Sequence, residues 1–218
     1  YYSYKNGKIV YAAYQSDARW ANRDYSVIKM IDIYTGQQRQ VTFKSKFFSP
    51  DINDAGTEIL AVNVNPDGTC NLCRIDATNG KLILKLKNAN NYFITHPKYI
   101  DAHTAVAAVR NRQGNMMLMK INLQTGSMND LTVFSYNVIG YPFVKGDTIY
   151  FNIMNENADK VFAYTMTNKK LYRVTQNSNG MYAPSVNDKG DLVVSAFNAQ
   201  GYRIAKITAG QQEWALNK

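Results

Sequence analysis

Short apolar runs recur along this chain at a near-constant spacing. Each run is five or six residues long, rich in β-branched and aromatic residues, and bounded by Gly, Asn, Asp or Pro, as strands are. The runs are residues 9–14, 59–64, 106–110, 149–154 and 193–197, and each is followed by a second apolar segment that ends before Gly36, Gly80, Gly126, Asn168 or Gly210. This pattern predicts strands throughout and no helix.

Alignment of the second segments places large apolar residues in two columns. The first column is Ile28, Leu72, Leu118, Val161 and Ile204, and the second is Ile31, Ile75, Ile121, Tyr164 and Ile207. Columns of this kind are expected where both faces of a sheet are covered by neighbouring sheets. We therefore expect every member of both columns to be buried.

Four prolines follow the same period, with intervals of 47, 45 and 42 residues between Pro50, Pro97, Pro142 and Pro184. A repeat of about 45 residues is the length of one four-stranded propeller blade. Gly and Asn stand at the turns between the strands, where hairpins need positive φ. The sequence predicts an all-β propeller of about five four-stranded antiparallel blades, as a single domain over 1–218. The predicted blades are residues 1–46, 47–92, 93–138, 139–180 and 181–218, with the last strand near residues 214–216.

Several segments carry a family signature. The segments are DIYTGQQRQVT at 32–42, LYRVT at 171–175, APSVNDKGDL at 183–192 and SPDINDAG at 49–56. They resemble the "D-L-x-T-G", "R-x-L-T" and "P-x-x-S-P-D-G" patterns of TolB-type (WD40-like) propeller repeats. The resemblance implies a protein exported to the bacterial periplasm or cell surface. Family members usually close with six blades, so the chain either closes with five or is a segment of a longer protein.

Composition narrows the class of partner. The chain has 218 residues and carries a net charge of +9. Its hydrophobic content of 45% and aromatic content of 12% exclude a disordered chain. No apolar run approaches the roughly 20 residues that span a bilayer, so we expect no membrane span. The positive charge favours anionic partners, although scattered surface lysines would give the same total. No nucleic-acid-binding motif is present, and we expect no nucleic acid partner.

The sequence contains no catalytic or metal-binding constellation that we recognise. Cys70 and Cys73 lie three apart on a predicted strand, point to opposite faces and align with Met116 and Met119, so we interpret them as core residues. The two histidines, His96 and His103, are too few for a three-histidine metal site. The sequence predicts no cofactor and no metal. Five acidic residues are expected to cap turns: Asp51, Asp54, Asp67, Asp147 and Asp188.

The predicted topology gathers two sets of loops at one rim: those joining the second and third strands of a blade, and those joining consecutive blades. Arg and aromatic residues, which are enriched at binding hot spots, concentrate in these loops. The candidate rim residues are Arg19, Trp20, Arg23, Lys44, Phe47, Tyr92, His96, Arg110, Arg112, Tyr136, Tyr141 and Tyr182.

This rim predicts a non-catalytic, monomeric binding or scaffold module of a larger exported envelope protein. Its expected partner is a protein, an anionic polymer or a glycan. Two alternatives stay open. One is a propeller that gates a peptidase or hydrolase domain outside this chain. The other is a glycan-binding or glycan-cleaving propeller that uses Trp20 and the tyrosines as sugar platforms.

Overall fold

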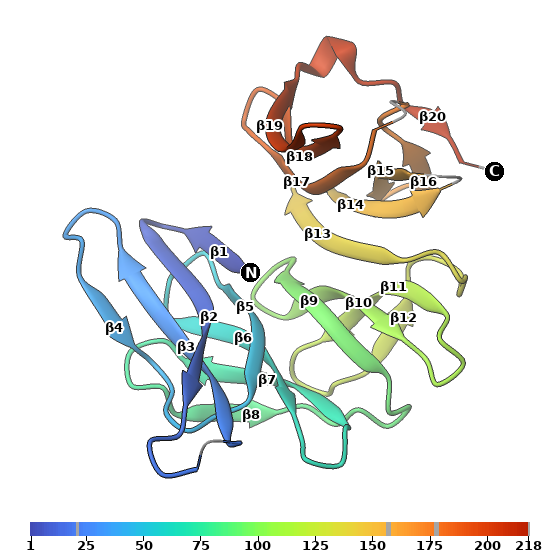
Figure 1. The fold of residues 1–218 in the computed structure, drawn as a ribbon. Coiled ribbons are helices and arrows are strands. Elements are labelled where there is room, and N and C mark those ends of the chain that lie inside the picture. The colour runs from blue at the N-terminus through green and yellow to red at the C-terminus, as the bar shows by residue number, and fades with distance from the viewer. Residues whose placement is uncertain (21, 156–157, 177–178, 218) are drawn as a thin grey trace. The chain divides into compact units, whose positions relative to one another are not determined.

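The computed structural model describes residues 1–20, 22–155, 158–176 and 179–217. These residues form strands throughout, together with one short 3-10 helix, η1 (Ala209–Gln211). The strands pair in five antiparallel sheets that follow one another along the chain (Figure 1). The prediction of an all-β fold with five successive sheets is confirmed.

The first three sheets have four strands each, in sequence order. The first contains β1 (Tyr2–Lys5), β2 (Lys8–Ser16), β3 (Asp24–Asp32) and β4 (Gln38–Gln40). The second contains β5 (Phe47–Ile52), β6 (Glu58–Val64), β7 (Cys70–Asp76) and β8 (Leu82–Lys85). The third contains β9 (Phe93–Tyr99), β10 (Thr104–Arg110), β11 (Met116–Asn122) and β12 (Met128–Asp130).

The last two sheets depart from four strands. The fourth contains β13 (Ile139–Lys145), β14 (Thr148–Asn155), β15 (Ala158–Thr165), β16 (Lys170–Arg173) and β20 (Ala215–Leu216). The fifth contains β17 (Met181–Val186), β18 (Leu192–Asn198) and β19 (Gly201–Ile207). The prediction that residues 214–216 complete the fifth sheet is wrong, because β20 pairs with β16 of the fourth sheet.

The chain divides into two compact units. Unit 1 comprises Tyr1–Asn111 and Lys120–Met128, and unit 2 comprises Arg112–Met119 and Asn129–Lys218. Unit 1 holds the first two sheets entirely, and unit 2 holds the last two. The single-domain assignment from the sequence stays a prediction.

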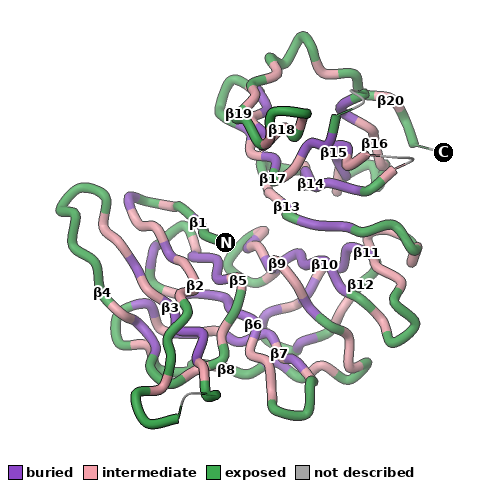
Figure 2. The backbone as a smooth tube through the Cα atoms, viewed as in Figure 1, coloured by how far each residue is buried: buried purple, intermediate pink, exposed green. Residues whose placement is uncertain are grey.

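Packing between successive sheets forms the core of each unit. In unit 1, Val10, Ile28 and Met30 of the first sheet pack against Ile59 and Ile75 of the second. In unit 2, residues of β14 and β15 pack in the same way against residues of β17 and β18. Figure 2 shows the result, with buried residues concentrated in the inner strands and the outermost strand β4 partly or fully exposed. The apolar columns are therefore the surfaces through which the sheets pack.

One member of the first column does not follow this rule. Ile28, Leu72, Leu118 and Val161 are all buried, whereas the side chain of Ile204 is 86% exposed. In the second column Ile75, Ile121 and Tyr164 are buried, and Ile31 and Ile207 are half-buried. The prediction for Ile204 is wrong because its face of β19 has no further sheet on it among the described residues, and its strand has no outer partner there.

The recurring prolines mark a bulge in the first strand of four sheets. The residue before each proline has positive φ, at 48° for Ser49, 48° for His96, 50° for Tyr141 and 49° for Ala183. At each of these positions the pairing with the next strand shifts register. A bulge re-aims the side chains that follow it. The prolines therefore recur because each first strand contains a β-bulge, and they do not mark turns.

The threonine that ends the family-like segments also has a structural role. Its hydroxyl accepts a hydrogen bond from a backbone N–H of the third strand, where the fourth strand diverges. The distances are 2.9 Å from Ile28 N to Thr42 Oγ1 and 3.0 Å from Val161 N to Thr175 Oγ1. A buried N–H without a partner costs free energy, so this hydroxyl allows the strand to end inside the core.

Candidate functional site

The connections between sheets and the loops between second and third strands meet at one end of unit 1. Ser26 N, at the start of β3, donates to Ser45 O at 2.9 Å. Val64 N, at the end of β6, donates to Lys46 O at 3.1 Å, and Cys70 Sγ donates to Tyr92 O at 3.1 Å. These bonds hold connections 41–46, 65–69 and 86–92, with the described residues 17–20 and 22–23 of the β2–β3 connection, at one end of the strands. We call this surface the loop rim of unit 1.

The β2–β3 connection is shaped by Asp17. Its carboxylate accepts hydrogen bonds from Arg19 N and Tyr25 Oη, both at 2.8 Å. These donors hold the pKa of Asp17 below its usual value, the backbone N–H of Arg19 having the larger effect. The same bond to Asp17 raises the pKa of Tyr25. The hydrogen-bonded carboxylate of Asp17 thus holds in place the loop that contains Arg19 and Trp20.

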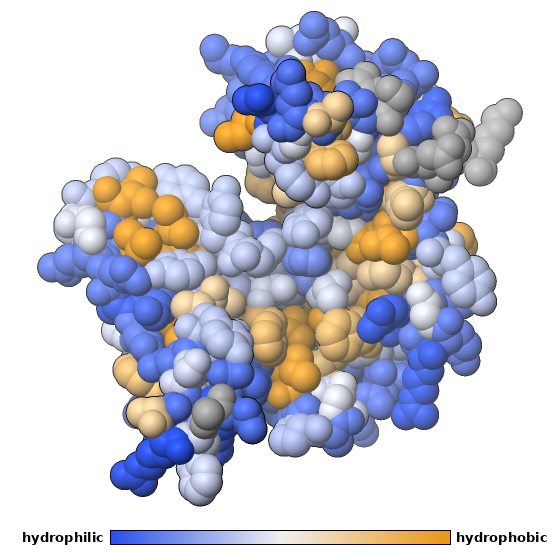
Figure 3. Space-filling view, viewed as in Figure 1, coloured by the Kyte–Doolittle hydropathy of each residue, from blue (hydrophilic) through white to orange (hydrophobic). Residues whose placement is uncertain are grey.

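Two cations lie over aromatic rings, one at this rim and one at the strand ends that adjoin it. The guanidinium carbon of Arg23 lies 5.5 Å from the ring centre of Tyr25, and that of Arg110 lies 5.2 Å from the ring centre of Phe93. The Trp20 side chain is 64% exposed. In the space-filling view the lower edge of unit 1, where the β2–β3 connection lies, is mainly hydrophilic (Figure 3). This surface offers stacked cations and an exposed indole to a partner.

The structure places the predicted rim residues in different settings. Arg19, Trp20, Arg23, Lys44 and Tyr92 lie in connections of the unit 1 rim, as expected. Five others belong to strands rather than connections: Phe47, His96, Arg110, Tyr141 and Tyr182. Phe47 in addition is half-buried and packs against the core of unit 1.

Unit 2 carries four of the predicted residues. Arg112 lies in the β10–β11 connection and is exposed, and Tyr136 in the β12–β13 connection is 81% exposed. Tyr141 lies in the bulge of β13. Tyr182 is half-buried, with its ring centre 5.8 Å from that of Tyr202. These residues belong to a different unit from Trp20, and we treat the two sets separately.

A buried polar network on the first strands was not predicted. Asp51 of β5 is fully buried and accepts hydrogen bonds from Ser3 Oγ at 2.6 Å, Lys98 Nζ at 2.8 Å and Tyr99 N at 2.8 Å. The assignment of Asp51 to a turn is wrong, because it follows the bulge at Pro50 and points inward. A usable signal existed: Asp51 and Lys98 both directly follow a repeat proline.

His96 belongs to this network rather than to the rim. Its ring centre lies 4.9 Å from that of Tyr1, and the Lys98 ammonium lies 5.1 Å from the Tyr1 ring centre. Burial and the neighbouring Lys98 charge lower the pKa of His96 to about 4. Burial also lowers the pKa of Lys98, but Asp51 and Tyr1 raise it by more, so that the net shift is upward. His96 is therefore neutral and Lys98 charged near neutral pH.

The cysteines behave as core residues. Both are free and buried, and burial raises the pKa of Cys73 to about 11.

Within the described ranges no three His, Cys, Asp or Glu side chains are grouped so that they could hold a metal ion. The described part of the chain also contains no helix with the length and apolar character needed to cross a membrane.

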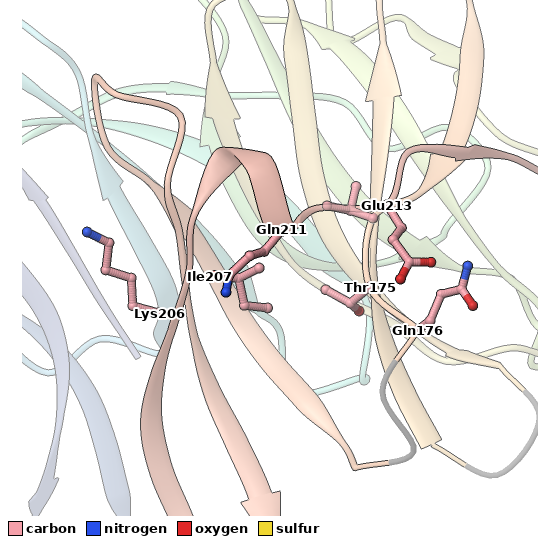
Figure 4. A pocket seen from close by; sticks show the side chains of 7 residues that line it. Thr175, Gln176, Lys206, Ile207, Gln211 and Glu213 are labelled. Carbon is pink, nitrogen blue, oxygen red and sulfur yellow. The ribbon is translucent and has the colours of Figure 1, made fainter.

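Unit 2 contains a hollow of about 280 Å³. It lies between the end of β19 and the chain that follows β16 (Figure 4). Its lining residues are Val174, Thr175, Gln176, Lys206, Ile207, Gln211 and Glu213. Figure 4 shows Lys206 extending to one side and Glu213 lying beside Thr175 and Gln176 on the other. The lining is mostly polar, and no catalytic arrangement is present among these residues.

The sheets and their connections define a TolB-type β-propeller fold. The chain is similar to TolB from Acinetobacter baumannii (TM-score 0.76, 16% identity), with all of this chain and 53% of that chain covered. It is also similar to a putative TolB from Agrobacterium tumefaciens (TM-score 0.70, 14% identity, 87% and 73% covered). A third match is the β-propeller domain of the Trilobed protease from Pyrococcus furiosus, described as having an open velcro topology. Its TM-score is 0.62 at 11% identity, over 100% of this chain and 82% of that one.

At these identities the likeness shows the fold alone. This chain spans about half the length of the Acinetobacter baumannii TolB chain that it matches. No protein-family model matches the sequence, and a comparison with curated proteins finds no match. The TolB-type resemblance read from the repeats is therefore confirmed for the fold, and the role of the protein is a separate question.

Proposed function

We propose that this chain is a non-enzymatic binding module that recognises an anionic partner through the loop rim of unit 1. The observation that carries the proposal is the pairing of cations with aromatic rings at this rim and at the strand ends beside it: Arg23 with Tyr25 and Arg110 with Phe93. Trp20 supplies an exposed aromatic surface beside Arg19. The net charge of +9 favours encounter with acidic protein surfaces or acidic polymers.

The proposal includes an exported setting, in the periplasm or at the cell surface of a bacterium. Its support is the likeness of the fold to TolB structures and the family-like segments of the repeats. In this view the chain is part of a larger envelope protein. The strands hold the sheets together, and recognition is left to the loops.

Calorimetric titration with two anionic probes tests the proposal. Poly-L-glutamate represents an acidic protein segment, and polygalacturonate represents an acidic glycan. We expect salt-sensitive binding, because exposed charges are screened at high ionic strength. The double variant Arg19→Ala/Trp20→Ala should weaken binding about tenfold or more, as loss of hot-spot residues does.

The matched control is Tyr34→Ala/Lys81→Ala, which removes one aromatic side chain and one charge from exposed turns between third and fourth strands. It should leave binding within about twofold, the scatter expected of residues outside a contact. Equal losses in the two double variants, or no binding of either polymer, would refute the rim proposal. Cleavage of polygalacturonate by the isolated chain would instead favour a glycan-cleaving propeller.

A second candidate is a propeller that gates a catalytic domain outside this chain. The observation that favours it is the likeness to the β-propeller domain of a protease over the whole of this chain. The reading frame that encodes this sequence distinguishes the two: a flanking peptidase or hydrolase domain supports gating. A reading frame without such a domain supports the binding module.

A further inference from the structure

The outer edge of β19 differs from the same edge in the other sheets. The third strand of each of the first four sheets is followed by an outer strand: β4, β8, β12 and β16. A backbone N–H from just beyond that strand donates to the first-column carbonyl, as from Val41 to Ile28 at 2.8 Å and from Val174 to Val161 at 2.8 Å. Among the described residues, β19 has no strand on this side. An edge of this kind is a template for strand addition.

The sequence that follows β19 repeats the one that forms β4. Residues 36–38 are Gly-Gln-Gln, and residues 210–212 are Gly-Gln-Gln. In the first sheet this stretch leads into β4, which pairs Ile31 with Gln38 and Met30 with Arg39. Matching the two Gly-Gln-Gln stretches transfers this pairing to the fifth sheet with a turn of four residues (208–211) in place of six (32–37). It then pairs Ile207 with Gln212 and Lys206 with Glu213.

This transferred register is favourable in charge and in burial. It sets the Lys206 ammonium opposite the Glu213 carboxylate, and cross-strand pairs of opposite charge stabilise a sheet. It sets Ala215 opposite Ile204, in the place that Val41 takes beside the buried Ile28. The exposed Ile204 side chain would gain a neighbour.

In the structure, however, these residues lie on the fourth sheet. Ala215 pairs with Arg173 and Leu216 with Tyr172. Trp214 packs its ring 5.6 Å from the ring centre of Tyr172 and 5.9 Å from that of Tyr150. The hollow of about 280 Å³ lies between this segment and β19, lined by Lys206 and Ile207 on one side and Glu213 on the other (Figure 4).

We propose that the outer edge of β19 is a docking site for the chain's own C-terminal segment (residues 210–217), which exchanges between β16 and β19. On β16 the segment packs Trp214 against the rings of Tyr150 and Tyr172. On β19 it fills the hollow, covers Ile204 and pairs Glu213 with Lys206. Because the two edges compete for one strand, docking on β19 uncovers the outer edge of β16 and the rings of Tyr150 and Tyr172. The segment therefore controls which of two sheet edges is open to another chain.

Disulfide trapping tests the exchange with one shared cysteine. Ala215→Cys is combined with Arg173→Cys, which reports the β16 position, or with Ile204→Cys, which reports the β19 position. Directly opposed strand residues are within disulfide reach. The control is Ala215→Cys with Tyr202→Cys, which is exposed on the same strand but two residues out of register. The native Cys70 and Cys73 are buried and lie in unit 1.

Both the 173/215 and the 204/215 pairs should form in a glutathione redox buffer. The effective concentration of the 204/215 pair should exceed that of the 202/215 control by about tenfold or more. Values equal to the control overturn the proposal, and so does a 204/215 bond that forms only between molecules. Circular dichroism of the reduced variants verifies that each remains folded.

A charge variant provides an independent readout. Glu213→Lys places two cations opposite each other in the β19 register, so it should lower 204/215 trapping by about twofold to fivefold. The 173/215 pair should be unaffected or form more readily. Glu213→Gln, which removes the charge without reversing it, should give an intermediate value. An unchanged 204/215 yield in Glu213→Lys would show that the inferred register is wrong.

Discussion

The Lys98 ammonium lies 2.8 Å from Asp51 Oδ1, in an ion pair that joins the first strands of two successive sheets. Asp51 is fully buried, and its other oxygen accepts the backbone N–H of Tyr99 at 2.8 Å. Ser3 of the first sheet completes the carboxylate's partners. One carboxylate therefore fastens three sheets near their innermost strands.

Removal of this carboxylate should be among the most damaging single changes in unit 1. Asp51→Ala leaves the charge of Lys98 buried without its counter-ion, and we expect a loss of about 3–5 kcal/mol in the free energy of unfolding. The double variant Asp51→Ala/Lys98→Met should recover part of this loss, because it removes the unpaired charge. Urea unfolding of the single and double variants measures the coupling. Strictly additive losses would show that the pair does not act as a unit.

His96 should make the protein sensitive to mild acid. Folding holds its pKa at about 4, against an ordinary value of 6.5. Between these pH values the unfolded chain binds a proton that the folded chain does not, so the free energy of unfolding falls as the pH drops from 6.5 to 4. The loss reaches about 3 kcal/mol for a shift of this size.

The variant His96→Asn should remove this pH-dependent part, since asparagine tolerates positive φ and does not titrate. His103→Asn is the matched control, because His103 is exposed in the β9–β10 turn. The measurement is the urea midpoint at several pH values from 7 to 4. If His96→Asn keeps the full acid dependence of the parent, burial of this imidazole is not its cause.

Two turn glycines with similar backbone angles should respond very differently to alanine. Gly80 (φ +72°) and Gly36 (φ +69°) occupy equivalent turns. A Cβ atom at Gly80 would lie 1.9 Å from Val41 O, whereas one at Gly36 meets nothing within 4 Å. Gly36→Ala should cost only the backbone strain, about 1–2 kcal/mol. Gly80→Ala should cost about 1–3 kcal/mol more, because the two sheets must move apart. Equal thermal midpoints for the two variants would contradict the close approach.

The first apolar column should divide into core and surface positions. Ile28→Ala removes a fully buried side chain and should cost about 2–5 kcal/mol. Ile204→Ala, at the equivalent position of the fifth sheet, should change stability by no more than about 0.5 kcal/mol. Chemical denaturation of both variants makes the comparison. A large loss at Ile204 would mean that its face is covered in solution.

Much of the fold could be predicted because each repeat carries its own turn residues and strand pattern. The pairing of β3 with β4 needs only a tight turn and nearby apolar residues, and such local signals are visible in sequence. The position of residues 214–216 was not predictable in this way. Their local sequence suits either sheet edge, and the choice depends on the distant rings of Tyr150 and Tyr172 that receive Trp214.

In the candidate site, too, local features could be predicted and long-range contacts could not. The position of Trp20 and Arg19 in a connection could be predicted because loops follow from topology. Their part in binding stays a prediction. Asp51 was missed because "Pro-Asp" favours a turn locally, whereas its partners Ser3 and Lys98 lie 48 and 47 residues away in sequence. Phe47 lies at the start of β5 rather than in the connection, and its partial burial depends on the neighbouring sheet. These placements depend on long-range contacts, which a local sequence pattern does not carry.

The open side of β19 also bears on solubility. A seven-residue strand with an exposed isoleucine at its centre could recruit the same strand of another molecule and start aggregation. Arg203 and Lys206 flank Ile204, and two molecules aligned edge to edge would bring these cations together. Lys206 is already paired with Asp191 at 2.8 Å. Repulsion between two such edges therefore rests mainly on Arg203, and neutralisation of Arg203 should promote precipitation.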